Sequence, residues 1–284
     1  MATLCPNCRR PVDPETLRCA GGHSFRDNED GVLVLLSQAL APRLETFIQA
    51  LRDFRQRQGN RLLDESAYDA LPEGEAAHPE WRRRCFDLEV VRPLVGHAPR
   101  SILDVGSYNG WLAHGLAQDG HEVTAVDYFT DPYDGLGARR FYCRAPWRSI
   151  QMDLKDLSLL NQTYDTVVLN RCLQFFPDPR AYFEHARELV APGGLLIATG
   201  LDIYWDPRRK IRSNDQQQAE YRARYDRDLF LHETRGHLDR RDLHALSAAG
   251  LAVRPYRRLW RANLVARAFR DRPRFCFGVW RRAG

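Results

Sequence analysis

Long apolar runs and lysine residues are both scarce in this sequence of 284 residues. No stretch approaches the roughly 20 apolar residues that a bilayer-spanning helix needs. No early segment joins a basic region to an apolar region long enough for a secretory signal. We therefore expect a cytoplasmic protein that has no membrane partner. Only Lys155 and Lys210 are lysines among the 42 basic residues, and such uniform use of arginine weakens the interpretation of any single arginine cluster.

Cysteine occurs in an odd number, so the seven cysteines cannot all be paired within the chain. Cys5, Cys8 and Cys19 lie within the first twenty residues, while the other four are scattered. This pattern favours a metal site together with free thiols in a reducing compartment over a framework of disulfides.

Charge is distributed unevenly along the chain. Residues 203–284 contain 20 basic and 9 acidic residues, a net charge of +11, which leaves −6 for residues 1–202. Such asymmetry can mark a protein with an anionic partner.

Alternating strand and helix patterns predict an α/β fold. We expect a Rossmann-like, doubly wound, mostly parallel sheet of seven strands, because the strands are separated by helical stretches. The predicted strands are 101–105, 122–127, 149–152, 165–170, 195–199, 252–259 and 275–280. The predicted helices are 42–58, 80–91, 110–118, 135–140, 179–190 and 240–249. These elements divide the chain into a small module (1–36), a helical linker (37–79) and a main domain (80–284) with an insert at 202–236.

The loop after the first strand of the main domain contains Asp104, Gly106, Tyr108 and Gly110. It lies at the carboxyl edge of the predicted sheet, where doubly wound folds bind ligands. A pyrophosphate would require Gly-x-Gly-x-x-Gly, so that the backbone can approach it closely. Here Tyr108 occupies the middle position and Asp104 adds a carboxylate. A ligand with an ammonium or sulfonium group therefore fits better than a dinucleotide.

Polar residues end the next strands as well. Asp127, with Tyr128 beside it, could accept hydrogen bonds from both hydroxyls of a ribose. Asp153 could accept from an adenine amino group, with Met152 against the ring, and Asn170 would lie at the centre of the cleft. One ligand that reaches all these positions has a cationic amino acid end, a ribose and an adenine.

These motifs, in this order and with 190–194 (Val-Ala-Pro-Gly-Gly), resemble those of class I S-adenosylmethionine methyltransferases. Residues 170–178 are similar to the segment that follows the fourth strand in the small-molecule branch of that family. The resemblance implies S-adenosyl-L-methionine as cofactor and a small-molecule acceptor. Tyr108 departs from the family, which usually has glycine there. A nicotinamide-dependent oxidoreductase is a weaker alternative, because Gly-x-Gly-x-x-Gly is absent.

Cys5, Cys8, Cys19 and His23 have the spacing of a tetrahedral Zn²⁺ site. A module of this size buries too little apolar area to fold alone, so a structural zinc ion would stabilise it. The module resembles the amino-terminal zinc ribbon of guanine-N1 ribosomal RNA methyltransferases, in which the ribbon helps to hold RNA. Methylation of ribosomal or transfer RNA is therefore a second hypothesis, and a non-catalytic scaffold in which Tyr108 blocks the cofactor is a third.

Methyl transfer needs a base only when the acceptor must lose a proton. His237 is the preferred candidate, and His232 and Tyr204 are further candidates. A histidine near a helix start is more often a capping or surface residue than a catalytic one. The insert at 202–236 would form a lid that recognises a phosphate or carboxylate of the acceptor, or a basic stripe along RNA.

Overall fold

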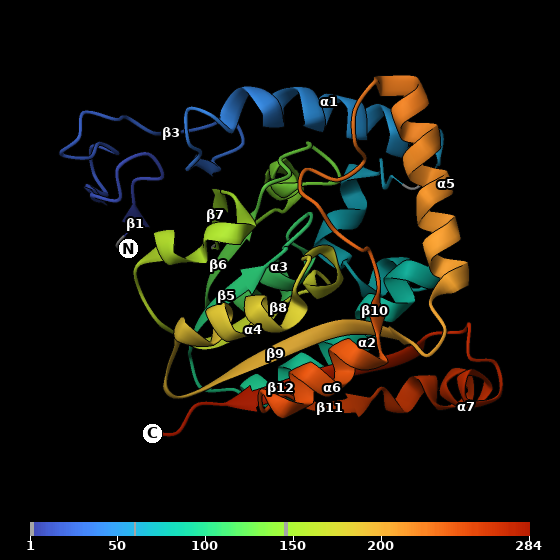
Figure 1. The fold of residues 1–284 in the computed structure, drawn as a ribbon. Coiled ribbons are helices and arrows are strands. Elements are labelled where there is room, and N and C mark those ends of the chain that lie inside the picture. Colours follow the sequence, from blue (N-terminus) through green and yellow to red (C-terminus); the bar gives the residue numbers. More distant parts are fainter. Residues whose placement is uncertain (1–2, 60, 145–146) are drawn as a thin grey trace.

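The computed structural model describes residues 3–59, 61–144 and 147–284. Within these residues, ten strands form one sheet and helices cover both of its faces (Figure 1). The strands are β3 (Arg26–Asp27), β4 (Leu33–Val34), β5 (Ser101–Val105), β6 (Glu122–Asp127), β7 (Arg148–Gln151), β8 (Tyr164–Leu169), β9 (Val190–Tyr204), β10 (Leu238–Asp239), β11 (Ala252–Pro255) and β12 (Arg274–Arg281). Their order is β11-β12-β9-β8-β5-β6-β7-β4-β3, and β10 pairs with the end of β9.

Seven of these strands correspond to the predicted sheet, and the α/β, Rossmann-like fold class is confirmed. Strands β5 to β9 pair in parallel, and β12 runs antiparallel to both of its neighbours. The central strand β5 is buried along nearly its whole length, as expected for a strand covered by helices on both faces. The predicted count of seven is too low because β3, β4 and β10 also join the sheet.

Seven α-helices in the described residues surround this sheet. They are α1 (Ala41–Arg57), α2 (Pro79–Val95), α3 (Trp111–Gln118), α4 (Pro179–Glu188), α5 (Arg208–Tyr225), α6 (Arg240–Ala248) and α7 (Trp260–Ala268). Short 3₁₀ segments are η1 (Glu65–Ala70), η2 (Glu73–Glu75), η3 (Leu136–Phe141), η4 (Leu154–Leu160), η5 (Leu173–Phe175) and η6 (Arg257–Leu259). Helix α4 begins as predicted, with the Asp178 side chain accepting a hydrogen bond from the Ala181 amide and Pro179 in the first turn.

The amino-terminal module is attached to the main sheet by backbone pairing. Strands β1 (Thr3–Leu4) and β2 (Pro11–Val12) form their own antiparallel pair. The β3–β4 hairpin instead continues the central sheet, because β4 pairs in parallel with β7. The guanidinium of Arg9 also binds both carboxylate oxygens of Asp156 in η4, at 2.5 and 2.8 Å. The last strand of the module thus belongs to the sheet of the main domain.

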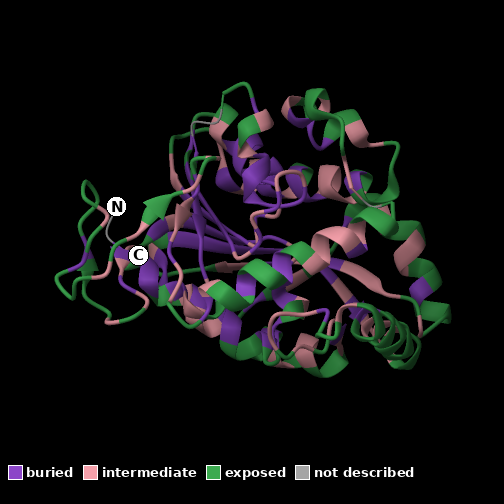
Figure 2. Ribbon diagram, turned by 90° about the horizontal axis from the view of Figure 1, so that it is seen from above, coloured by how far each residue is buried: buried purple, intermediate pink, exposed green. Residues whose placement is uncertain are grey.

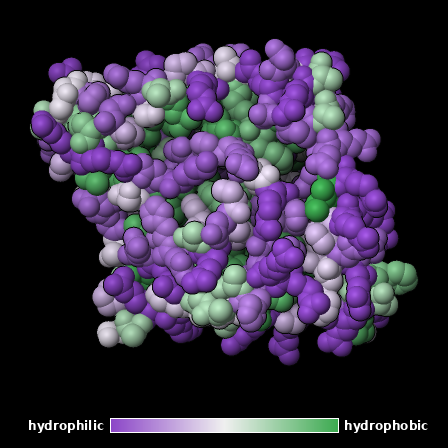
Figure 3. Space-filling view, in the orientation of Figure 1, coloured by the Kyte–Doolittle hydropathy of each residue, from purple (hydrophilic) through white to green (hydrophobic). Residues whose placement is uncertain are grey.

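Burial follows the layers of the fold. Seen from above, the central strands are buried and the surrounding helices turn exposed faces outward (Figure 2). Hydrophilic residues cover most of the face in Figure 3, and apolar residues appear mainly in recesses between them. In the described part of the chain, each helix is too short or too polar to cross a membrane.

Several segments differ from the sequence-based expectation. Helix α5 occupies about half of the region predicted only as an insert at 202–236. Strand β9 is much longer than the predicted strand at 195–199 and extends to Tyr204. The predicted strand at 252–259 ends at Pro255, and a 3₁₀ turn follows it. Helix α7 was not predicted, because its alternation of arginine, alanine and large apolar residues has no clear amphipathic period.

The turn between β5 and α3 is closely packed at Gly110. Its backbone is left-handed, with φ +83°, and a Cβ atom there would lie 2.4 Å from Cη2 of the buried Trp147 ring. Gly120, just beyond the end of α3, also has a positive φ (+91°), but a Cβ atom there would meet nothing within 4 Å. Comparing alanine substitutions at the two glycines therefore distinguishes the free energy lost to backbone strain from that lost to a steric clash.

We expect Gly110→Ala to lower the free energy of unfolding more than the control Gly120→Ala. Both variants place a side chain in the left-handed region, which costs about 1–2 kcal/mol. Only Gly110→Ala adds overpacking, worth roughly 1–3 kcal/mol more. Urea unfolding measures the difference, and equal losses in the two variants would contradict the close packing against Trp147.

Candidate functional site

A cavity of about 630 Å³ lies at the carboxyl ends of the parallel strands. Helices α1 and α5 and the segment 229–237 contribute to its other walls. Phe54 of α1 packs edge-on against Tyr221 of α5, with ring centroids 5.1 Å apart, so these two helices meet beside the cavity. Nine of the residues predicted for the site line it: Gly106, Tyr108, Asp127, Tyr128, Asp153, Asn170, Tyr204, His232 and His237.

Three predicted cofactor residues do not line this cavity. Asp104 is fully buried below it, and its Oδ2 accepts a hydrogen bond from the Ser107 hydroxyl at 2.6 Å. Burial raises the pKa of Asp104 to about 7, although the Ser107 hydrogen bond opposes that shift. Met152 is fully buried, and Gly110 packs on Trp147. These residues support the loop and strands that carry the lining residues.

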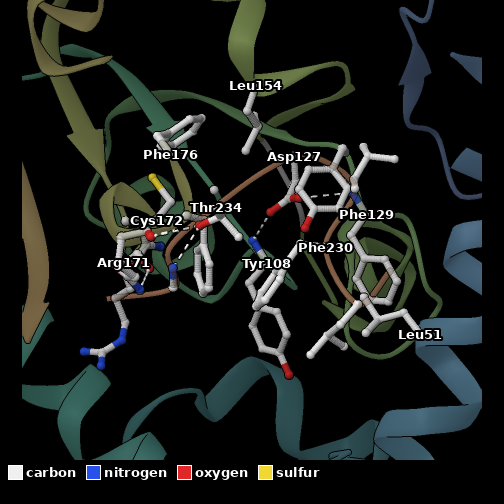
Figure 4. Close-up of a pocket in the computed structure, with 18 of the residues that line it drawn as sticks. Leu51, Tyr108, Asp127, Phe129, Leu154, Arg171, Cys172, Phe176, Phe230 and Thr234 are labelled. Carbon is white, nitrogen blue, oxygen red and sulfur yellow. Dashed lines mark hydrogen bonds between the residues drawn. The ribbon is translucent and has the colours of Figure 1, made fainter. Parts of the chain in front are cut away.

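Asp127 and Tyr108 lie together at the centre of the cavity wall (Figure 4). Asp127 accepts backbone hydrogen bonds from the amides of Tyr108 (2.9 Å) and Phe129 (3.0 Å). Burial raises the pKa of Asp127 to about 6, and these two amides oppose the rise. Each carboxylate oxygen retains a second lone pair, so Asp127 can still accept hydrogen bonds from a ligand.

The Tyr108 ring is held at one side of the cavity by its hydroxyl. That hydroxyl donates to Oδ1 of Asp134 at 2.7 Å and accepts from Nη2 of Arg55 at 3.0 Å. Tyr108 has φ +58°, a conformation that glycine adopts more easily, which matches the glycine usual at this position in the resembling family. The interactions of the hydroxyl with Asp134 and Arg55 compensate for this strain.

Asp153 pairs with His232 across the cavity rim. Nε2 of His232 lies 3.0 Å from Oδ1 of Asp153, which also accepts from the Lys155 amide at 3.0 Å. Burial works to raise the pKa of Asp153, but the hydrogen bonds from His232 and Lys155 lower it below its usual value. His232, a predicted catalytic candidate, therefore hydrogen-bonds to Asp153, the residue predicted to bind the adenine.

Asn170 follows β8, and its side chain is buried and lines the cavity. It also faces Asp104, and a hydrogen bond between the two side chains works to lower the pKa of that carboxyl. Asn170 therefore links the buried Asp104 to the cavity wall. Apolar side chains surround this half of the cavity in Figure 4, among them Phe129, Leu154 and Phe176.

The other half of the cavity carries the cations Lys210 and Arg83 together with the carboxylates of Asp202 and Glu80. Lys210, from the inner face of α5, has no ion pair among the described residues, and burial lowers its pKa although the charge of Asp202 opposes that shift. Arg83 lies 3.3 Å from Asp202. Burial and the Asp202 charge raise the pKa of Tyr204 to about 12, so its hydroxyl remains a neutral donor rather than a base.

His237 lines this cationic half with a defined orientation. Its Nδ1 lies 2.9 Å from the Arg235 carbonyl oxygen, and since a carbonyl only accepts, Nδ1 of the neutral ring carries the proton. Nε2 is then left with a free lone pair. Asn214 of α5 donates to the same Arg235 carbonyl at 3.1 Å and to the Gly236 carbonyl at 3.3 Å, so it fixes the turn that carries the histidine.

Arg84 and the residues of α1 were not predicted as part of the site. Arg84 lines the cavity beside Tyr108, with its guanidinium carbon 4.6 Å from the Trp81 ring centroid and 5.2 Å from that of Tyr108. Burial lowers the pKa of Arg84. In a sequence with 42 basic residues, nothing local distinguishes Arg84 from the other arginines.

Helix α1 is tied over the cavity by buried ion pairs. Asp131 and Asp134, which follow β6, are almost completely buried. Asp131 binds Arg52 and Arg61 at 2.5 Å each, and Asp134 binds Arg55 at 2.7 Å. Leu51, Phe54 and Gln58 of the same segment line the cavity. The predicted linker thus contributes a wall of the site.

The amino-terminal module brings together four potential metal ligands. One ligand atom from each of Cys5, Cys8, Cys19 and His23 lies within 4.8 Å of all the others. The Cys8 and Cys19 sulfurs are 3.6 Å apart, and Nδ1 of His23 lies 3.5 Å from the Cys5 sulfur and 3.4 Å from the Cys19 sulfur. Four ligands at about 2.3 Å from a tetrahedral zinc ion would be about 3.7 Å apart.

Comparison with protein families identifies one that covers most of the chain. Residues 43–254 match the family described as "Methyltransferase domain". The match includes α1 and every strand from β5 to β10, so it covers all the elements that line the cavity.

Curated relatives match a smaller part. The chain is 32% identical over 103 residues to malonyl-[acyl-carrier protein] O-methyltransferase of Hahella chejuensis, which covers 36% of this chain and 37% of the relative. It is 31% identical over 118 residues to ubiquinone biosynthesis O-methyltransferase of Vibrio parahaemolyticus, covering 41% of this chain and 49% of that protein. The chain thus spans less than half the length of these two curated relatives.

A solved structure resembles the fold over a longer stretch. Geranyl diphosphate C-methyltransferase from Streptomyces coelicolor, solved with S-adenosyl-L-homocysteine, superposes with a TM-score of 0.50 and 15% identity. The match covers 78% of this chain and 83% of that chain. At this identity the similarity establishes the fold.

Proposed function

We propose that this chain, which belongs to the methyltransferase domain family, transfers the methyl group of S-adenosylmethionine to a small-molecule acceptor. The observation that carries the proposal is a cavity with two chemically different halves. One half presents Asp127, Asp153 and Asn170 among apolar side chains, and the other presents Lys210 and the ion pair of Arg83 with Asp202 beside a buried histidine.

The first half suits S-adenosylmethionine, which when bound supplies a methyl group activated by a sulfonium. We infer that Asp127 accepts hydrogen bonds from the ribose and that Asp153 lies at the adenine end. The donor of Asn170 and the guanidinium of Arg84 are suited to oxygen acceptors, and the carboxylate of the methionine part is such a group. Asp104 contributes from below by holding the loop through Ser107.

The second half suits an acidic or phosphorylated acceptor. Lys210 provides positive charge where the cavity is partly shielded from water, so an anionic group would be held there more strongly than at the surface. The charge of Arg83 is shared with Asp202. His237 is the base we propose for an acceptor that loses a proton, because its Nε2 carries the free lone pair. Alignment of the two reactants and exclusion of water supply the remaining acceleration.

A small acceptor is favoured over RNA. Helix α1 is held across the cavity by buried ion pairs, and α5 closes an adjacent side. Both curated relatives are named as O-methyltransferases, one of an acyl-carrier-protein substrate and one of ubiquinone biosynthesis. The amino-terminal module and the basic segment around α7, the elements that would hold RNA, contribute none of the described residues that line the cavity, so we do not propose RNA methylation.

We also propose that the amino-terminal module binds a structural zinc ion through Cys5, Cys8, Cys19 and His23. Their spacing agrees with a tetrahedral site that has no open position. A Cβ atom at Gly21 would lie 2.7 Å from the Cys8 sulfur, so a glycine is required for the turn to close around this cluster. The ion would stabilise the β3–β4 hairpin that joins the main sheet.

Asp127→Asn is expected to weaken binding of S-adenosylmethionine by about 1–3 kcal/mol, because a charged hydrogen-bond acceptor is lost. Isothermal titration calorimetry measures this change. Asp165→Asn is the matched control, since Asp165 also lies on a strand of the sheet but binds Ser101 at the opposite end. Equal affinity for S-adenosylmethionine in the wild type and both variants would contradict the cofactor assignment. If the wild type gives no heat of binding, the result would favour the non-catalytic scaffold.

His237→Gln is expected to slow transfer of tritiated methyl groups into a deproteinised metabolite extract by at least about 100-fold, as for loss of a general base. Affinity for S-adenosylmethionine should stay unchanged. His244→Gln, at an exposed position on α6, is the control. Appearance of the label in a parallel RNA sample instead of the extract would contradict the small-molecule proposal.

The purified protein is expected to contain one zinc ion per chain by mass spectrometry of the metal. Cys19→Ser should lose the zinc and lower the melting temperature, since the ion holds a module that buries little apolar area. Cys143→Ser, which changes an exposed cysteine outside the cluster, should keep the metal. A zinc-free wild type with a normal melting temperature would refute the site.

A further inference from the structure

Helix α7 exposes a group of large apolar side chains. Trp260, Leu264, Val265 and Phe269 are 55%, 49%, 49% and 59% exposed. Trp260 and Leu264 are four residues apart and lie on neighbouring turns of one side of α7. Phe269 follows the end of the helix in extended backbone. Large exposed apolar groups that gather on one element indicate an interaction surface.

Arginines surround this apolar group. Residues 254–274 contain eight arginines and a single acidic residue, Asp271. Among the described residues only one of the eight, Arg258, forms an ion pair, with Glu89. Arg257, Arg261, Arg267 and Arg270 are exposed, and the guanidinium of Arg261 lies over the Trp260 ring. The apolar group is therefore set in a strongly positive surface.

A second cavity of about 660 Å³ adjoins the same helix. Trp260 and Leu264 of α7 form part of its wall, together with Leu243 of α6 and Val253 of β11. Arg257 and Arg267 also line it. Its mostly apolar lining beside positive charges is suited to an acyl chain with an anionic head group.

We propose that α7 and its flanking arginines form a docking surface for a bilayer that contains anionic lipid. Exposed tryptophan, leucine and phenylalanine side chains with arginine around them bind at the boundary between head groups and acyl chains. The arginine stems can extend along the apolar side chains while their charges meet lipid phosphates. The expectation of no membrane partner was based on the absence of long apolar segments from the sequence. A surface that docks on a bilayer does not require a membrane-spanning segment.

Other occupants fit the surface less well. A second copy of the chain would bring the same cluster of arginines against itself, and like charges at such an interface repel. RNA would use the arginines and Trp260, but Leu264 and Val265 offer no aromatic ring for a base to stack on. A bilayer uses both the charge and the aliphatic side chains.

The surface adjoins the base of the cavity wall. The Arg270 carbonyl, just beyond α7, accepts a hydrogen bond from the Asp206 amide at 2.9 Å, and Asp271 lies 3.2 Å from Arg209 of α5. Docking would therefore occur next to the first turn of α5. In Figure 1, α7 lies at the end of the molecule opposite the amino-terminal module.

Sedimentation with vesicles tests the proposal. The full-length protein should bind vesicles of equal parts phosphatidylglycerol and phosphatidylcholine, and should not bind pure phosphatidylcholine vesicles. The double variant Trp260→Ser, Leu264→Ser should bind the mixed vesicles at least about tenfold more weakly, because the apolar contact is lost. Leu63→Ser, an exposed leucine outside α7, is the matched control and should bind like the wild type.

Charge is tested separately with Arg261→Gln and Arg267→Gln. Each should weaken binding to the mixed vesicles about fivefold, while Arg43→Gln on α1 should not. Unchanged melting temperatures show that the variants are folded. The proposal is overturned if the wild type ignores the mixed vesicles, if the double variant affects RNA binding rather than vesicle binding, or if the double variant instead converts a dimer to a monomer in ultracentrifugation.

Discussion

The position of α1 over the cavity depends on the buried carboxylates of Asp131 and Asp134. Three arginines from α1 and the segment after it neutralise these two charges, and a buried carboxylate left without its partner costs several kcal/mol. Asp134 also accepts from Tyr108, so one network fixes the helix, the loop after β6 and the tyrosine of the β5–α3 turn. The ion pairs and hydrogen bond of Asp134 therefore hold both the α1 wall of the cavity and Tyr108, the residue with the strained backbone.

Helix α5 contributes to the opposite half in a comparable way. Lys210, Asn214 and Gln217 are spaced so that they share the inner side of the helix, and all three line the cavity. Asn214 orients His237 through the Arg235 carbonyl, while Lys210 adds positive charge near Asp202. A helix with mostly exposed residues thus supplies both the orientation of the proposed base and the electrostatics around it.

The parallel sheet and the polar residues at its strand ends were predictable because strand ends in a doubly wound fold meet at one edge. The Cys/His cluster was predictable from its spacing. Contributions that depend on pairing between distant segments were not: β4 is only two residues long, and nothing in its local pattern indicates that it pairs with β7. The contributions of Arg84 and α1 to the site also depend on contacts between distant segments, so they were not predicted. Asp104 was predicted to line the cavity but is buried below it, because its burial depends on the packing of neighbouring strands.

The pairing of β4 with β7 also determines how the sheet ends. Without β4, β7 would present unpaired amide and carbonyl groups to any other chain, as exposed edges do in proteins that aggregate. With the hairpin in place, the outermost strand is β3, which has two residues and both of them charged. At the other edge, β11 ends in Arg254 and Pro255, residues that discourage further pairing. The amino-terminal module is therefore also a protective cap, and its unfolding would make the whole protein prone to self-association.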